Sequence, residues 1–194
     1  MASTIYVDKV DPASGTALEL GSSGDTLTVP SGATLAIASG GTLANSGTAT
    51  GVGGNNTPSF KATCSGTTTV ANDANVKIAF DTEVWDTDSA FDTSNYRFTV
   101  PAGEGGKYFF IASMEINITS ATTSMRPMIW KNGATVIRSM GYVSYYDSKS
   151  TSGVVNLSAG DYIEAYLYQN AGGSQAVQTS VTDTFFIGYK LIGV

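Results

Sequence analysis

Hydrophobic residues in the N-terminal part of the chain recur with a period of eight. The pattern Gly-x-Thr-Leu places leucines at Leu27, Leu35 and Leu43, and a β-branched residue follows two positions after the first two of them, at Val29 and Ile37. Residues two apart on a β-strand point to the same side, and Gly and Ser lie between the copies. Each copy therefore predicts one short strand with an apolar stripe, followed by a turn.

A single chain cannot bury this stripe by itself. Repeating β units need neighbours, and a solenoid requires at least about three stacked coils, whereas residues 21–46 supply roughly one. Three chains wound around a common axis could each contribute one strand to every layer. The repeat therefore predicts a homotrimeric β-stalk, packed through Leu27, Val29, Leu35, Ile37 and Leu43. The alternative is a flexible linker, because segments rich in Gly and Ser usually behave as one.

The hydrophobic pattern changes after residue 58. Short apolar-rich runs now alternate with turn sequences at a spacing of roughly ten residues, which is typical of all-β sandwiches and barrels. We expect strands at Val76–Phe80, Tyr96–Val100, Tyr108–Ile118, Pro127–Trp130, Thr135–Ser139, Val154–Leu157, Tyr162–Tyr168 and Thr184–Ile192. No helical period is sustained, so residues 59–194 predict a jelly-roll β-sandwich head. The Gly-rich segment 47–58 predicts a linker between the stalk and this head.

The composition restricts the chemistry that this chain can perform. It has no histidine and one cysteine, which excludes a Ser-His-Asp triad, a histidine-ligated metal site and an internal disulfide. The net charge of −6 and the pI near 4.4 argue against binding to nucleic acid or to an anionic membrane surface. No apolar stretch is long enough to span a bilayer. We expect a protein that binds rather than catalyses, without a cofactor.

Four motifs in residues 59–194 carry a resemblance to a known family. They are Tyr96-Arg-Phe-Thr-Val-Pro101 with Gly106-Lys-Tyr-Phe-Phe110, then Lys131-Asn-Gly133, Leu157-Ser-Ala-Gly-Asp-Tyr-Ile163 and Phe185-Phe-Ile-Gly-Tyr-Lys-Leu191. Their order resembles that in the jelly-roll head of the complement component 1q and tumour necrosis factor superfamily. The resemblance implies a head that trimerises through one sheet face, with its last strand near the interface. It does not identify a ligand, because one fold serves many functions.

The N-terminal segment carries a different resemblance. Ala2-Ser-Thr-Ile-Tyr-Val-Asp-Lys-Val10, followed by Gly- and Thr-rich repeats, resembles the attachment end of marine bacteriophage fibres and appendages. The Gly-X-Y collagen stalk of complement proteins is absent from the sequence. The resemblance implies an appendage on the exterior of a virion, on its tail or its capsid. Residues 1–20 are then the segment that anchors the protein to another virion protein.

These features together lead to one hypothesis and several alternatives. The hypothesis is a homotrimeric virion structural protein, a phage tail fibre or appendage whose head attaches to a receptor or glycan on the host surface. A capsid decoration or cement protein and a secreted, lectin-like trimer with the same head remain open. A polysaccharide depolymerase is the enzymatic alternative, but nothing in the sequence brings together the two carboxylates that a glycosidase needs.

One cluster of aromatic and polar residues is a candidate ligand-binding site. Tyr142, Tyr145, Tyr146 and Asp147 lie within six residues, ahead of a Ser- and Thr-rich turn. Aromatic rings can stack on the C–H faces of sugars, and short acidic side chains can bond to sugar hydroxyls. The sequence therefore predicts carbohydrate recognition here. The alternative is that these tyrosines line the trimer interface, because interfaces are also enriched in tyrosine.

A second cluster is acidic. Asp81, Glu83, Asp86, Asp88 and Asp92 lie within twelve residues that contain no base. Oxygen ligands of this kind can hold a hard cation such as calcium. The spacing does not match an EF-hand loop, because the glycine and the final glutamate of that loop are missing. A solvated acidic loop is the interpretation that such charge clusters usually support, and calcium remains the alternative.

Overall fold

The chain divides into two units, Met1–Ala49 and Thr50–Val194. The computed structural model describes residues 10, 12, 14–15, 18, 20, 22–44, 46 and 56–191, and for residues 119–123 it describes the backbone alone. The boundary between the units falls inside the segment 47–58. Most of the expected anchor, residues 1–20, lies outside the described residues.

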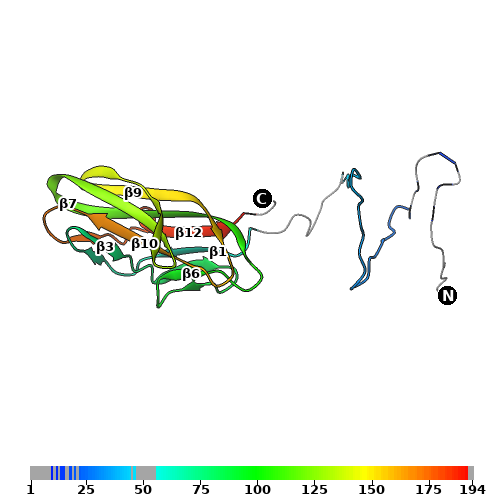
Figure 1. Ribbon diagram of the computed structural model, residues 1–194, viewed down its shortest axis with the longest axis horizontal. Helices are drawn as coiled ribbons and strands as arrows, with labels where there is room; N and C mark the ends of the chain where they lie inside the picture. Colours follow the sequence, from blue (N-terminus) through cyan, green and yellow to red (C-terminus); the bar gives the residue numbers. More distant parts are fainter. Residues whose placement is uncertain are drawn as a thin grey trace. The chain divides into compact units, whose positions relative to one another are not determined.

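The second unit, called the head below, is built from β-strands over its described residues 56–191, which contain no helix (Figure 1). The strands are β1 (Ser59–Thr63), β2 (Thr68–Val70), β3 (Ala74–Lys77), β4 (Thr82–Asp86), β5 (Phe91–Asp92), β6 (Arg97–Thr99), β7 (Gly106–Lys131), β8 (Ala134–Arg138), β9 (Gly141–Leu157), β10 (Tyr162–Gln169), β11 (Gln175–Val177) and β12 (Phe185–Lys190). Across all the residues described, no helix is long and apolar enough to cross a membrane.

The strands of the head form two layers. One layer contains β4, β1, β12, the first part of β7, and β9, and the other contains β5, β6, β10, the last part of β7, and β8. The 26-residue β7 belongs to both layers, because its residues 106–118 pair with β9 and its residues 125–131 pair with β10. All these pairings are antiparallel. The all-β jelly-roll head that the sequence predicts is confirmed.

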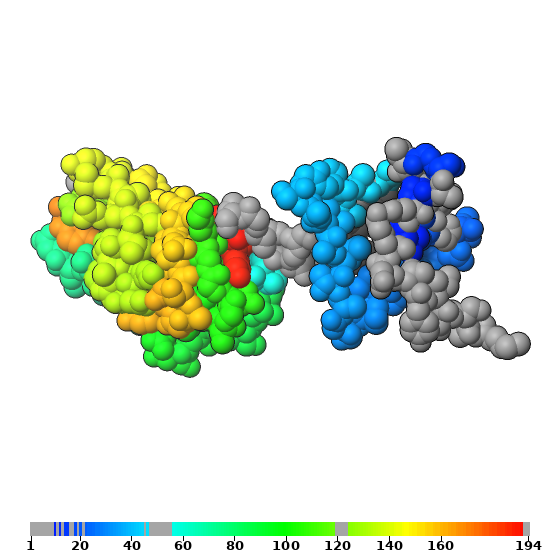
Figure 2. Space-filling view, turned by 45° about the vertical axis from the view of Figure 1, so that its right-hand side comes forward, coloured from blue at the N-terminus to red at the C-terminus, as the bar shows by residue number. Residues whose placement is uncertain are grey.

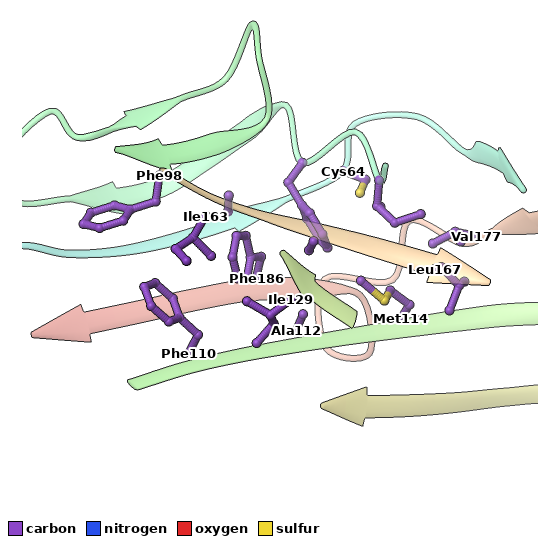
Figure 3. Close-up of a cluster of buried hydrophobic side chains, with 14 of the residues drawn as sticks. Cys64, Phe98, Phe110, Ala112, Met114, Ile129, Ile163, Leu167, Val177 and Phe186 are labelled. Carbon is purple, nitrogen blue, oxygen red and sulfur yellow. The ribbon is translucent and has the colours of Figure 1, made fainter. Parts of the chain in front are cut away.

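The core between the layers is centred on aromatic rings. The ring centroid of Phe60 in β1 lies 4.7 Å from that of Phe91, 5.1 Å from Phe98 and 5.0 Å from Phe186. Figure 3 shows Phe98 and Phe186 among aliphatic side chains that come from both layers. All four rings are buried. Residues of β12 alternate between buried and half-buried positions, as the period of two in a strand requires.

Strand β12 passes directly against two of these rings. A Cβ atom added at Gly188 would lie 2.5 Å from two atoms of the Phe110 ring and 2.6 Å from the ring of Phe60. Carbon atoms in van der Waals contact are about 3.5 to 4.0 Å apart. The absence of a side chain at Gly188 is therefore what allows β12 to lie at the centre of its layer.

The first unit repeats one local structure along residues 22–44, called the repeat segment below. Gly24, Gly32 and Gly40 have φ angles of 94°, 83° and 84°, a conformation that glycine adopts without strain. Each sits in a β-turn closed by one backbone hydrogen bond, from Asp25 N to Ser22 O, Ala33 N to Pro30 O, and Gly41 N to Ala38 O. The turns recur every eight residues, in register with the leucines. Within the repeat segment of this single chain no strand pairing forms.

Candidate functional site

The tyrosines that the sequence singles out lie on β9 and are exposed. Tyr142, Tyr145 and Tyr146 are exposed by 66%, 70% and 65%, and Figure 2 shows the yellow region around position 145 at the surface of the head. These three residues are called the tyrosine end below. They surround a bulge, because the β7–β9 register shifts between Ile118 and Thr123 of β7. Bulges of this kind redirect side chains and are frequent beside binding sites.

The tyrosine end lies far from the place where the chain enters and leaves the head. Lys190 N donates a hydrogen bond to Pro58 O, so the first and last described parts of the head are neighbours. Lys190 is paired with Tyr108 of β7, and Tyr145 is paired with Ile118. Ten residues of strand separate these two positions on β7, which corresponds to about 33 Å. The tyrosines therefore occupy the end of the head opposite its chain termini.

The backbone at Tyr145 is unusual. Its φ angle is 57°, in the left-handed region that residues other than glycine seldom adopt. Such a conformation costs on the order of 1 kcal/mol and persists only where the surrounding structure imposes it. Here the register shift opposite Tyr145 imposes it. The strained position holds a large exposed aromatic side chain within β9, at the bulge between β7 and β9.

An open hollow of about 260 Å³ lies beside the tyrosine end. Its lining combines one tyrosine, one serine and three carboxyl groups, from Tyr146, Ser148, Glu115, Asp147 and Asp183. Asp147 Oδ2 accepts a hydrogen bond from Lys149 at 2.9 Å. Asp183 accepts bonds from the hydroxyls of Ser180 and Thr182, which lower its pKa.

This lining can recognise hydroxyl groups. The carboxylate oxygens accept hydrogen bonds from hydroxyl donors, and the Tyr146 ring offers an apolar face beside them. The four residues that the sequence nominates, Tyr142, Tyr145, Tyr146 and Asp147, are all in the same stretch of β9. Glu115 of β7 and Asp183, which precedes β12, join them only through the fold, and nothing in their local sequence marks them.

Carboxylates of the acidic cluster accept hydrogen bonds from groups in the neighbouring loops. Asp81 accepts hydrogen bonds from the N–H and hydroxyl of Ser65, and these bonds lower its pKa although partial desolvation acts in the opposite direction. Asp86 accepts the N–H groups of Asp88 and Phe91. Glu83 is exposed on β4. Among the described residues no group of three or more acidic or cysteine side chains could hold a metal ion. The carboxylates Asp81 and Asp86 instead stabilise the loops around β4.

A second surface carries large apolar residues that the sequence analysis did not assign to a site. It lies on the outer side of the layer β4–β1–β12–β7 and consists of Trp85, Phe109, Ile111, Phe185, Ile187 and Tyr189, called the aromatic face below. Ile187 is paired with Ile111 on one side and Lys61 on the other. The rings of Phe109 and Tyr189 lie 5.5 Å apart. Five of these residues are half-buried and Trp85 is 43% exposed.

The sequence does contain a sign of this face. The runs Tyr108–Ala112 and Phe185–Tyr189 are apolar at nearly every position, whereas a strand with one face in water alternates apolar and polar residues. One set of alternate residues, such as Phe110 and Phe186, fills the core. The other set, such as Phe109 and Ile187, points outward. A strand that is apolar on both sides is expected to be covered on both sides.

Lys61, on the aromatic face, lies against two aromatic rings. Lys61 Nζ lies 5.5 Å from the ring centroid of Phe185 and 5.9 Å from that of Trp85. Such cation–π contacts let a lysine remain charged on an otherwise apolar surface. Beside it, Trp85, Ile187 and Tyr189 line a shallow hollow of about 280 Å³. The face can therefore accept side chains from another molecule.

Comparison with known proteins identifies the head. The family model of the C1q domain matches residues 59–191. Among solved structures, murine APRIL at pH 5.0 is similar over 69% of this chain and 98% of its own, with 17% identity and a TM-score of 0.54. The globular domain of zebrafish complement 1qA is 18% identical over 69% of this chain and 97% of its own, with a TM-score of 0.46. No curated protein matches the sequence.

Proposed function

The chain belongs to the C1q domain family, and we propose that it is a homotrimeric structural protein of a virion whose head attaches to a glycan on the host surface. C1q-like domains typically form trimers. The observation that carries the proposal is the aromatic face, a surface suited to self-association on a head that also presents exposed tyrosines elsewhere.

Self-association through the aromatic face follows from its composition. Aromatic residues and isoleucine are the groups that gain most from leaving water, at roughly 1.5 to 3 kcal/mol for a fully buried side chain. A contiguous apolar patch on the solvent side of a sheet is a mark of an interface. Phe109, Ile187 and Tyr189 lie on the two central strands of the layer, so a trimer formed here would cover them. The tyrosine end would stay exposed.

The ligand class follows from the hollow beside the tyrosine end. Exposed rings at Tyr145 and Tyr146 provide stacking surfaces, and the carboxylates of Glu115, Asp147 and Asp183 provide acceptors for hydroxyl groups. The three carboxylates are balanced only in part by the ammonium of Lys149 on Asp147, so the hollow stays net negative and repels an anionic ligand. The proposed ligand is therefore a neutral or amino sugar on the host envelope rather than a sialylated, uronate-rich or phosphorylated glycan.

The placement on a virion rests on the N-terminal segment. We propose that residues 1–20 bind another virion protein and that the head projects outward as part of a tail fibre or appendage. The support is the resemblance of residues 2–10 and of the following repeats to the attachment ends of phage fibres. We further propose a binding role without catalysis, because the chain has no histidine and its single cysteine is buried.

The oligomeric state tests the proposed interface. Sedimentation velocity should give a species of about 60 kDa, three times the chain mass of 20.1 kDa, and Ile187→Glu should weaken trimer formation in the head because it places a charge in the centre of the aromatic face. Val136→Glu is the matched control, since Val136 is an exposed apolar residue on β8 outside this face. A wild-type protein that remains a monomer at micromolar concentration contradicts the proposal.

A glycan array tests the ligand. We expect binding to neutral or amino-sugar glycans, and Tyr145→Ala should weaken it on the order of tenfold, the loss of about one stacking contact. Tyr96→Ala, an aromatic change on the turn before β6, is the control that should leave binding intact. Binding confined to acidic glycans, or no difference between the two variants, argues against this site. The bound glycans should also keep their chain length, because shortening would indicate a depolymerase.

Labelling of intact particles tests the placement. An antibody against the head should mark a few projections at the tail or another appendage of purified virions. Dense label over the whole capsid would indicate the alternative role of a decoration protein. Absence of the protein from purified virions would favour the secreted, lectin-like trimer.

A further inference from the structure

We infer that the repeat segment forms a three-chain β-stalk by pairing with two further copies of this chain. Its large apolar side chains are all exposed in the single chain. Leu27, Leu35 and Leu43 are exposed by 70%, 63% and 65%, and Val29 and Ile37 by 44% and 49%. Five large apolar side chains that recur regularly and remain in contact with water mark a surface that binds another molecule.

The backbone of the repeat segment points to the same conclusion. The turns are separated by two runs of six residues, 25–30 and 33–38, that contain no turn or helix. Figure 1 draws both runs as plain tube without strand arrows. Among the described residues of the segment, the backbone–backbone hydrogen bonds are the three turn bonds. Each run reaches about 20 Å when extended. The N–H and C=O groups along both of its edges can pair with another chain.

The charge and size of the side chains favour a copy of the same chain as the partner. Asp25 is the only charged residue of the repeat segment, so identical chains can lie side by side in register with no like-charge repulsion beyond that one position. The residues between the large apolar ones are small, such as Ala33 and Ala36, and they allow backbones to approach closely. A differently charged partner would find no complementary charge along this stripe.

The number of copies comes from the head. A trimer of heads would hold three repeat segments near one another at a high effective concentration, and a closed three-fold assembly gives each segment two neighbours. The number three therefore rests on the proposed trimer of the head. The pairing itself rests on the repeat segment alone, so the two proposals can fail separately.

Hydrogen–deuterium exchange on the full chain tests the stalk. We expect amides of the repeat segment to exchange about 100-fold more slowly than an unstructured chain, because paired strands protect them. Leu35→Ser should remove this protection while leaving the exchange of the head strands unchanged. Thr34→Ser is the control, a substitution by the same residue type at the neighbouring position, which leaves the leucine row intact and should preserve protection. A trimeric wild type whose repeat segment exchanges at unstructured rates overturns the stalk and leaves the head trimer standing.

The oligomeric state separates the two contacts. If the stalk forms, Ile187→Glu should still associate through the repeat segment, with protected amides there, and the double variant Ile187→Glu/Leu35→Ser should be a monomer. The stalk as an interaction surface of its own would be overturned if Ile187→Glu alone were a monomer whose repeat-segment amides exchanged without protection. Protection of the repeat that persists in the monomeric double variant would also overturn it, because the order would then come from within one chain.

Discussion

Replacement of Gly188 by alanine adds a single methyl group at a crowded point of the core. Its Cβ would lie 2.5 Å from the Phe110 ring and 2.6 Å from Phe60, at least about 1 Å inside normal contact. Neither ring can move aside, because Phe60 is already stacked 4.7 Å from Phe91 and Phe110 lies 6.2 Å from Phe186. Strand β12 must shift instead, and overpacking of this kind costs about 1 to 3 kcal/mol.

We expect Gly188→Ala to lower the free energy of unfolding by about 3 kcal/mol, the upper end of the range for overpacking, because rings from two strands obstruct the methyl group. For a domain of this size the loss corresponds to a fall in Tm of about 10 °C. Thermal unfolding followed by near-ultraviolet circular dichroism measures this fall in Tm, at equal subunit concentration for every variant. Gly173→Ala is the control, because a Cβ there meets nothing within 4 Å. A Tm within about 2 °C of the wild type for Gly188→Ala would refute the rigid packing assumed here.

Three further experiments test individual side chains of the head. A hydrogen bond from Lys131 lowers the pKa of Asp161 to about 2. The Asp161 carboxylate therefore stabilises the fold above its unfolded pKa of about 4, and this contribution disappears as the pH falls toward 2. Urea unfolding should show that Asp161→Asn is less stable than the wild type at neutral pH, and the difference should close in acid. Burial raises the pKa of Cys64 to about 12, so the thiol should resist a disulfide reagent at neutral pH until urea unfolds the head. Lys77→Ala removes the cation that lies 3.0 Å from the buried carboxylate of Glu164. We expect the free energy of unfolding to fall by about 2 kcal/mol, and the double variant Lys77→Ala/Glu164→Gln to recover part of it. Equal stabilities of the wild type and the single variant would contradict this.

Local signals in the sequence located the strands and turns that depend on near neighbours. The expected strand Tyr162–Tyr168 is β10 (Tyr162–Gln169), and Thr135–Ser139 corresponds to β8. The Asn-Gly pair between β7 and β8 forms a turn with φ angles of 50° at Asn132 and 81° at Gly133, the conformation for which this pair is preferred. Side-chain alternation and turn chemistry act over a few residues, so they can be recognised without the fold.

Two strands, β7 and β9, are much longer than expected because their partners are distant. The runs Tyr108–Ile118 and Pro127–Trp130 are parts of one strand, β7. Between its paired residues Ile118 and Thr123, four residues of β7 lie opposite the single residue Ser144 of β9, so β7 itself bulges there and continues as a strand beyond the bulge. The first half of β9, which contains Tyr142 and Tyr145, also lacks apolar alternation, and its pairing with β7 makes it a strand. Polar residues in a strand resemble a loop when only their neighbours in the chain are considered.

The octad period, the scarcity of charge and the absence of histidine are properties of the sequence alone. They indicate repeated turns, an all-β head and a binding role before the tertiary structure is known. The aromatic face is different. Phe109 and Tyr189 are about eighty residues apart in the chain, and they meet because β7 and β12 pair in one register, which a shift by a single residue would invert. That register is set by core packing at Gly188, Phe110 and Phe60. Only the tertiary structure therefore decides which apolar residues are covered by the head itself and which remain for a partner.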